Sequence, residues 1–174
     1  GNGVLVGIGV SVGAGVSDGT GVSDGTGVSV GSGVRVPVGV TLGSSVDEDA
    51  YVFSAYDAQL AFGGLNHDVV FFGHTHVPTL FSYHDENGRP TLRARLLTGR
   101  RTVIDLVPGT RYLINPGSVG QPRDRDPRAA YAIYDEGNRR VYLYRVPYRA
   151  SAARRRIIQA GLPPVLGDRL LHGA

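Results

Sequence analysis

Two histidines separated by one residue are the strongest candidates for chemistry in this sequence. They lie in the segment Gly73-His74-Thr75-His76, which directly follows the apolar run from Asp68 to Phe72. Because Gly73 permits a sharp turn after a buried strand, both imidazoles can face one cleft. Neutral imidazole nitrogens are good ligands for divalent iron, manganese, zinc or nickel. The pair therefore predicts a metal site, with ordinary turn histidines as the alternative.

The residues around this pair resemble a known family. The segment 68–78, with the sequence DVVFFGHTHVP, resembles the closing histidine motif of the calcineurin-like metallophosphoesterases, notably their small bacterial phosphodiesterase and phosphatase branch. The segment 113–123, LINPGSVGQPR, is similar to the strand and loop that follow in that branch. Near the end, the segment 160–163, AGLP, is similar to the family's usual finish. The matches occur in the family's order, and the resemblance covers about Asp47 to Ala174.

The resemblance implies a two-metal site for hydrolysis of a phosphate monoester or diester, in which a metal-bound water attacks phosphorus. His74 would bind one metal ion and His76 the other, and no side chain would serve as the nucleophile. Arg123 has two interpretations. It could donate to a substrate phosphate through its guanidinium, or it could pair with Asp124 or Asp126.

The chain also departs from the family pattern. The family's site uses an Asp-x-His motif, a Gly-Asp motif, an asparagine motif and a further histidine, all of which would precede Asp68. Asn66-His67-Asp68 matches the asparagine motif in letters but lies too close to His74, and Leu42 stands where the further histidine is usual. We therefore expect two divalent metal ions that this chain holds weakly and little activity from the chain alone. The alternative is a non-catalytic remnant that acts as a structural or interaction module.

The elements that must position the histidines follow from hydrophobic periodicity and turn signals. The pattern predicts a helix over Asp47 to Leu65 and a buried strand over 68–72. It also predicts a final helix over Ser151 to Ala160 that Pro163 and Pro164 stop. Further strands are predicted at 79–84, 92–97, 101–106, 111–114, 130–134 and 140–146. This order indicates an α/β or α+β fold. With the resemblance, we expect an α/β fold, the C-terminal portion of a metallophosphoesterase β-sandwich flanked by helices.

Residues 1–45 have a different character from residues 46–174, which are expected to form a partial metallophosphoesterase domain. The first segment repeats every six residues with glycine and valine, so it could form a strand-rich solenoid or a mobile low-complexity chain. The units Ser17 to Thr20 and Ser23 to Thr26 do not have the nine-residue spacing of calcium-binding repeats. Because the chain begins at Gly1, we expect a fragment or a processed product.

The composition excludes several classes of protein. The 174 residues are enough for one domain, and the absence of cysteine excludes disulfides and thiolate metal sites. No apolar stretch is long enough for a membrane span, so a cytoplasmic protein is the default expectation. The net charge is +3, but the arginines are scattered along the sequence, which argues against a nucleic-acid partner. Arg154, Arg155 and Arg156 are interpreted as the solvated face of a helix.

Overall fold

The computed structural model describes residues 3–6, 38–41 and 50–174. Most of the glycine-valine repeat, including the two Ser-Asp-Gly-Thr units, therefore lies outside the described residues. Two short strands of this region are described, β1 (Gly3–Val6) and β2 (Val38–Thr41). Each joins a sheet whose other strands come from the rest of the chain.

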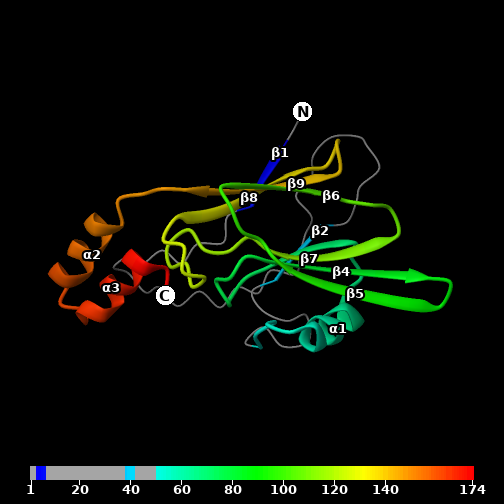
Figure 1. Ribbon diagram of the computed structural model, residues 1–174, viewed down its shortest axis with the longest axis horizontal. Coiled ribbons are helices and arrows are strands. Elements are labelled where there is room, and N and C mark those ends of the chain that lie inside the picture. Colours follow the sequence, from blue (N-terminus) through cyan, green and yellow to red (C-terminus); the bar gives the residue numbers. More distant parts are fainter. Residues whose placement is uncertain (1–2, 7–37, 42–49) are drawn as a thin grey trace.

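Two sheets pack face to face in a β-sandwich (Figure 1). Sheet A is antiparallel with the order β1-β8-β9-β6, and sheet B is mixed with the order β2-β3-β7-β4-β5. The remaining strands are β3 (Val69–Phe72), β4 (Thr79–Glu86), β5 (Arg89–Leu96), β6 (Arg101–Asp105), β7 (Thr110–Asn115), β8 (Ala129–Asp135) and β9 (Arg140–Val146). The predicted class, an α/β fold with a metallophosphoesterase-like sandwich and flanking helices, is confirmed.

β3 lies at the centre of the packing because both of its faces are buried. Val69 and Phe71 point into the space between the sheets, where they pack with residues of β7, β8 and β9. Val70 and Phe72 point to the opposite side of sheet B, into a second apolar cluster. The four side chains are at most 1% exposed. A continuous apolar run is the expected pattern for a strand covered on both sides.

Helix α1 (Ala55–Gly64) covers the second face of sheet B. It is shorter than the predicted helix, since residues 50–54 are not helical and residues 47–49 lie outside the described part. The reason is a capping box: the Ser54 hydroxyl accepts from the Asp57 N–H, and the Asp57 carboxylate accepts from the Ser54 N–H. This pair fixes the start of the helix at a position that apolar spacing alone does not specify.

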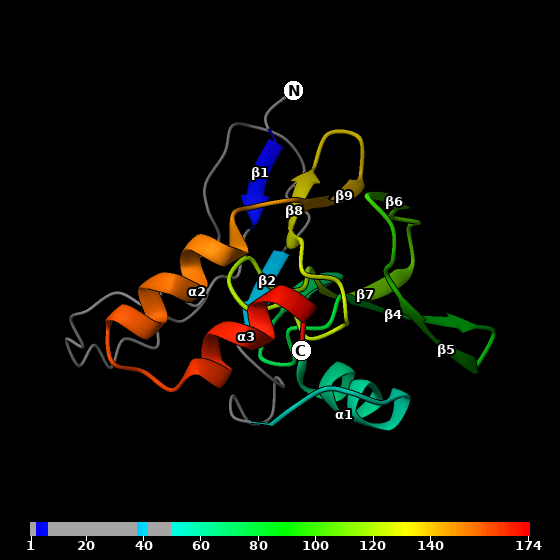
Figure 2. The same ribbon diagram turned by 60° about the vertical axis from the view of Figure 1, so that its left-hand side comes forward.

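Two helices follow sheet A and lie together at one end of the sandwich (Figures 1 and 2). α2 (Ala150–Gln159) is the predicted final helix, but α3 (Pro164–His172) was not predicted. The sequence analysis interpreted the two prolines as a stop, whereas Pro164 begins α3, because proline is well suited to the first position of a helix. Arg154 joins the two helices through an ion pair with Asp168 at 2.5 Å. Within the described residues, no helix combines the length and apolar character needed to cross a membrane.

Candidate functional site

The histidine pair and Asn115 come from neighbouring parallel strands. β3 ends at Phe72, directly before Gly73, and β7 ends at Asn115. The two strands pair in parallel, with Phe71 opposite Ile114, so their carboxyl ends meet at the same edge of sheet B. Loops at this edge are the usual position for a site in a sheet with parallel strands. Asn66 and His67 precede β3, at its opposite end, and so lie away from the histidine pair.

The backbone of the histidine loop has an unusual conformation. His74 and His76 have φ angles of 67° and 60°, in the left-handed region that residues with a side chain rarely adopt. Thr75 lies between them and is only 3% exposed. The positive φ angles turn the chain sharply at both histidines. Each such residue costs on the order of 1–3 kcal/mol of folding free energy. The surrounding structure must therefore supply contacts that hold the loop.

Asn115 supplies these contacts. It is fully buried, and its amide nitrogen donates to the Gly73 carbonyl at 3.0 Å and to the Thr75 hydroxyl at 2.9 Å. Its amide oxygen accepts from the Gly117 N–H at 2.8 Å. One side chain thus connects the histidine loop to the loop that follows β7. The sequence predicts that Asn115 braces the loop before Pro116 through a bond to nearby backbone, and its bond to the Gly117 N–H agrees with that role. Its bonds to Gly73 and Thr75 of the histidine loop were not predicted.

His76 has a fixed ring orientation. Its Nδ1 lies 2.9 Å from the Gln121 carbonyl oxygen, which can only accept, so Nδ1 carries the proton and Nε2 keeps its lone pair when the ring is neutral. Burial lowers the pKa of His76, and the positive charge of Arg123 lowers it further, against the opposing effect of the Gln121 hydrogen bond. Both features favour a neutral imidazole with one nitrogen free. A histidine that donates its other ring N–H to a backbone carbonyl is the usual form of a metal ligand.

The ring of His74 is held by stacking. It lies parallel to the Tyr51 ring, with 4.0 Å between centroids and 15° between planes. Tyr51 in turn stacks on Phe53 at 5.1 Å. Among the described residues, no hydrogen bond to the His74 ring accompanies this contact. Tyr51 and Gln121 are the positioning residues that sequence reasoning missed, because only the tertiary structure brings residues 51 and 121 to the histidines.

Arg123 lies beside the histidine loop, where its backbone N–H donates to the His76 carbonyl at 3.3 Å. Its guanidinium donates to the Gln121 side-chain oxygen at 3.1 and 2.7 Å. Asp124 and Asp126 were the alternative partners predicted for Arg123. Both form ion pairs with other arginines instead. Arg123 therefore lies next to His76, in the loop that follows β7.

The residues present fit one side of a metal site. Two imidazoles are available, and His76 has the geometry of a ligand. Within the described ranges, however, no group of three or more histidine, aspartate, glutamate or cysteine side chains is close enough to hold a metal ion. Stable binding usually takes at least three protein ligands. The described residues thus offer two of the side chains that such a site would need, and no third one beside them.

Comparisons with known proteins agree with this geometry. The family model of the calcineurin-like phosphoesterase superfamily domain matches residues 33–139. An uncharacterised protein of Methanocaldococcus jannaschii is 41% identical over 106 residues, which are 61% of this chain and 40% of that protein. A crystal structure of a metallophosphoesterase from Sphaerobacter thermophilus has a TM-score of 0.67 and 37% identity, over 78% of this chain and 54% of that one.

A hypothetical protein from Pyrococcus horikoshii has the same fold, with a TM-score of 0.55 and 17% identity over 79% of this chain and 46% of that one. The chain spans about half the length of these relatives or less. The match therefore includes the histidine loop and the strands that hold it, and leaves a large part of each relative without a counterpart.

Proposed function

The chain belongs to the calcineurin-like phosphoesterase superfamily, and we propose that it supplies the histidine edge of a site that hydrolyses a phosphate monoester or diester. Members of this superfamily typically depend on two metal ions. The observation that carries the proposal is the His76 ring, whose Nδ1 is engaged by the Gln121 carbonyl so that Nε2 is free. When bound, divalent metal ions would acidify a water molecule and neutralise charge on the phosphoryl group.

Each residue at the edge has a proposed task. His74 and His76 bind different metal ions, which could be manganese, iron, zinc or nickel. Asn115 holds the loop between the two rings, and Tyr51 holds the His74 ring through their stacked faces. Arg123 binds the phosphate of the substrate, because Nε and Nη2 donate to Gln121 while Nη1 has no partner among the described residues.

We further propose that the chain alone has low activity. The described residues offer the two imidazoles and no third ligand near them. We propose that the remaining ligands of a complete site correspond to the part of the longer relatives that has no counterpart in this chain. The same observation favours the second candidate function, a non-catalytic member of the family that acts as a structural or interaction module.

The test is a manganese titration of the purified chain followed by NMR of the histidine ring protons. Bound Mn²⁺ should broaden the signals of His74 and His76 before those of His84, which lies on β4. The variants His74→Ala and His76→Ala should each weaken binding about 10-fold or more. His84→Ala is the matched control, because it removes an imidazole that bonds the Gly109 carbonyl instead.

Hydrolysis of bis-p-nitrophenyl phosphate in the same samples separates the two candidate functions. Slow hydrolysis that requires Mn²⁺ and both histidines, but not His84, supports the catalytic proposal. Absence of Mn²⁺ binding at the pair would overturn it and favour the structural module. Rapid Mn²⁺-dependent turnover by this chain would contradict only the claim of low activity.

Two further expectations from the sequence stay proposals: the boundary near residue 45 and the cytoplasmic location. Limited proteolysis checks the first of these. Cleavage confined to residues before about position 46 supports the boundary, and early cleavage within 50–174 contradicts it.

A further inference from the structure

The outer face of sheet A carries a different set of side chains from the inner face. Alternate residues of β8 and β9, such as Ala132, Val141 and Leu143, are buried between the sheets. The residues between them point outward and are partly or fully exposed, in three ranks that the strand register aligns across β6, β9 and β8. The ranks are Arg101-Tyr144-Tyr131, Val103-Tyr142-Ile133 and Asp105-Arg140-Asp135.

Three tyrosines and one arginine in the first two ranks contact each other. Tyr131 and Tyr144 stack with 5.3 Å between ring centroids and 21° between planes. The Arg101 guanidinium lies 5.3 Å from the centroid of the Tyr142 ring and 5.9 Å from that of Tyr144. We call Arg101, Tyr131, Tyr142 and Tyr144 the tyrosine-arginine face. These residues are up to 43 positions apart in the sequence, and only the register of the sheet brings them together.

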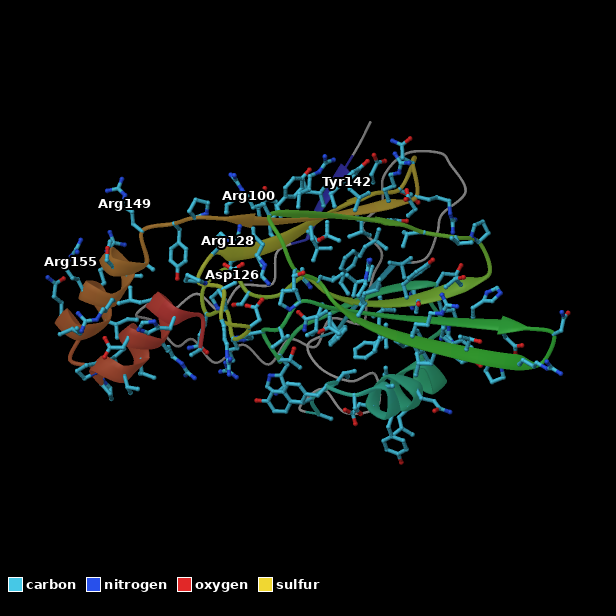
Figure 3. All side chains as sticks on the ribbon, viewed as in Figure 1. Arg100, Asp126, Arg128, Tyr142, Arg149 and Arg155 are labelled. Atoms are coloured by element: carbon cyan, nitrogen blue, oxygen red, sulfur yellow. The ribbon has the colours of Figure 1, made fainter. Side chains whose placement is uncertain are left out.

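Charge is unequal along this side of sheet A. In the third rank, Arg140 is neutralised by Asp105 at 2.6 Å. On the other side of the first rank, toward α2, the exposed arginines are Arg100, Arg149, Arg155 and Arg156. Neither these arginines nor Arg101 form an ion pair within the described part of the chain. The Arg100 carbonyl accepts from the backbone of β9. Figure 3 shows Arg100 and Tyr142 on the upper side of sheet A, and Arg149 and Arg155 beyond the end of the sheet, at the start of α2 and on α2.

No helix among the described elements covers this face. α1 packs against sheet B, where it contacts β4 and β5. α2 and α3 contact each other at the end of the sandwich (Figure 2). The composition of the face also differs from that of a face that packs on a helix, because it includes arginines and an ion pair instead of a continuous apolar surface. Within the described part of the chain, no element therefore covers these side chains, which suit a partner that carries both planar rings and negative charge.

We propose that the tyrosine-arginine face binds single-stranded nucleic acid. The scattered arginines argue against such a partner in the sequence alone, but the sheet register places Arg101 beside three tyrosines. Exposed aromatic rings on a sheet stack on unpaired bases, and arginines attract the phosphates between them. A duplex hides its bases in the helix, so it would engage only the arginines. An acidic peptide would likewise use the charge and leave the three rings without a stacking partner. This inference is separate from the histidine edge, since none of the four residues contacts it.

The test is fluorescence anisotropy with labelled oligothymidylate of about 12 nucleotides, within the usual site size of such surfaces, in EDTA so that phosphoesterase activity cannot degrade the probe. We expect binding at low salt that weakens steeply as salt rises, and weaker binding of a duplex of the same length. Tyr144→Ala should weaken binding roughly 5-fold or more, whereas Tyr144→Phe, which keeps the ring, should bind like the original chain.

Arg101→Gln should weaken binding a few-fold and reduce the salt dependence by about one phosphate contact. Arg95→Gln is the charge-matched control, because Arg95 is an exposed arginine on β5 of sheet B. Three results would overturn the proposal: no binding at low salt, equal affinity for the duplex, or equal losses in Arg101→Gln and Arg95→Gln with no loss in Tyr144→Ala. Circular dichroism of each variant confirms that the fold is retained.

Discussion

The histidine edge and the tyrosine-arginine face lie on the same sandwich but are built in opposite ways. The histidine edge depends on backbone: two residues with positive φ are held by the buried amide of Asn115. The tyrosine-arginine face depends on side chains that project from regular strands, with no strained backbone among its four residues. A single substitution of the buried Asn115 is therefore expected to change the geometry of the histidine edge. A substitution on the tyrosine-arginine face is expected to change the surface and leave the fold intact.

Asn115→Ala is expected to give the largest effect. It would leave the Gly73 carbonyl, the Thr75 hydroxyl and the Gly117 N–H without their partner in a buried setting. We expect a loss of about 3 kcal/mol in the free energy of unfolding, measured by urea denaturation. Asn138→Ala in the exposed turn after β8 is the control and should cost less than about 1 kcal/mol. Equal costs would show that the histidine edge is not held by Asn115.

Gly117→Ala should come next. Gly117 has a φ of 87°, and an added Cβ would lie 2.6 Å from Pro78 Cγ and 3.0 Å from Ala130 Cβ. Gly109 has a similar φ of 76° but open space around it, so Gly109→Ala measures the conformational strain alone. We expect Gly117→Ala to cost about 2 kcal/mol more than Gly109→Ala in thermal or urea unfolding. A difference near zero would mean that the loop after β7 can shift freely.

The ion pairs of Asp126, which lie outside both regions, should respond to acid. Hydrogen bonds from Arg128, with the charge of Arg145 on β9, lower the pKa of Asp126 from 3.8 to about 2. A lowered folded-state pKa adds stability above about pH 4, and this stability is lost as the pH falls through about 2. The contribution is about 1 kcal/mol, because the pair is partly exposed and solvent screens it.

Unfolding free energies of the original chain and of Asp126→Asn, measured between pH 5 and pH 2, check this expectation. The difference between them should be largest above pH 4 and should shrink toward pH 2. Arg128→Gln should reproduce the same pH dependence by removing the other partner. A difference that stays constant over this range would contradict the proposed ion-pair origin.

The smallest effect on stability is expected on the tyrosine-arginine face. Tyr131→Ala removes a cross-strand contact with Tyr144 on a partly exposed surface. Such pairs contribute about 0.2–1 kcal/mol, so the unfolding free energy should change by about 0.5 kcal/mol. A loss as large as that of Asn115→Ala would show that these tyrosines are structural and would remove the contrast between the two regions.

Much of the fold could be predicted from the sequence, because local patterns encode it. The strand at 140–146 has the predicted bounds, and β4, β5, β6, β7 and β8 differ from their predicted ranges by a few residues. Helix ends were less predictable. α1 starts at the capping box of Ser54 and Asp57, and α3 starts at Pro164, where the same proline was interpreted as a stop. A helix start depends on a few side-chain hydrogen bonds or on one fixed φ angle, which apolar spacing does not report.

By itself, the sequence determined the family, the α/β class and the candidate ligands His74 and His76, because the loop after β3 carries them within one short segment. The tertiary structure decided which residues hold and surround them. Tyr51 reaches the histidines from the segment before α1, and Asn115 and Gln121 reach them from the end of β7 and the loop after it. Sheet register brings Arg101 next to three tyrosines that are far apart in the sequence. Contacts between distant segments depend on how the strands pair and how the sheets pack, and no local pattern records either.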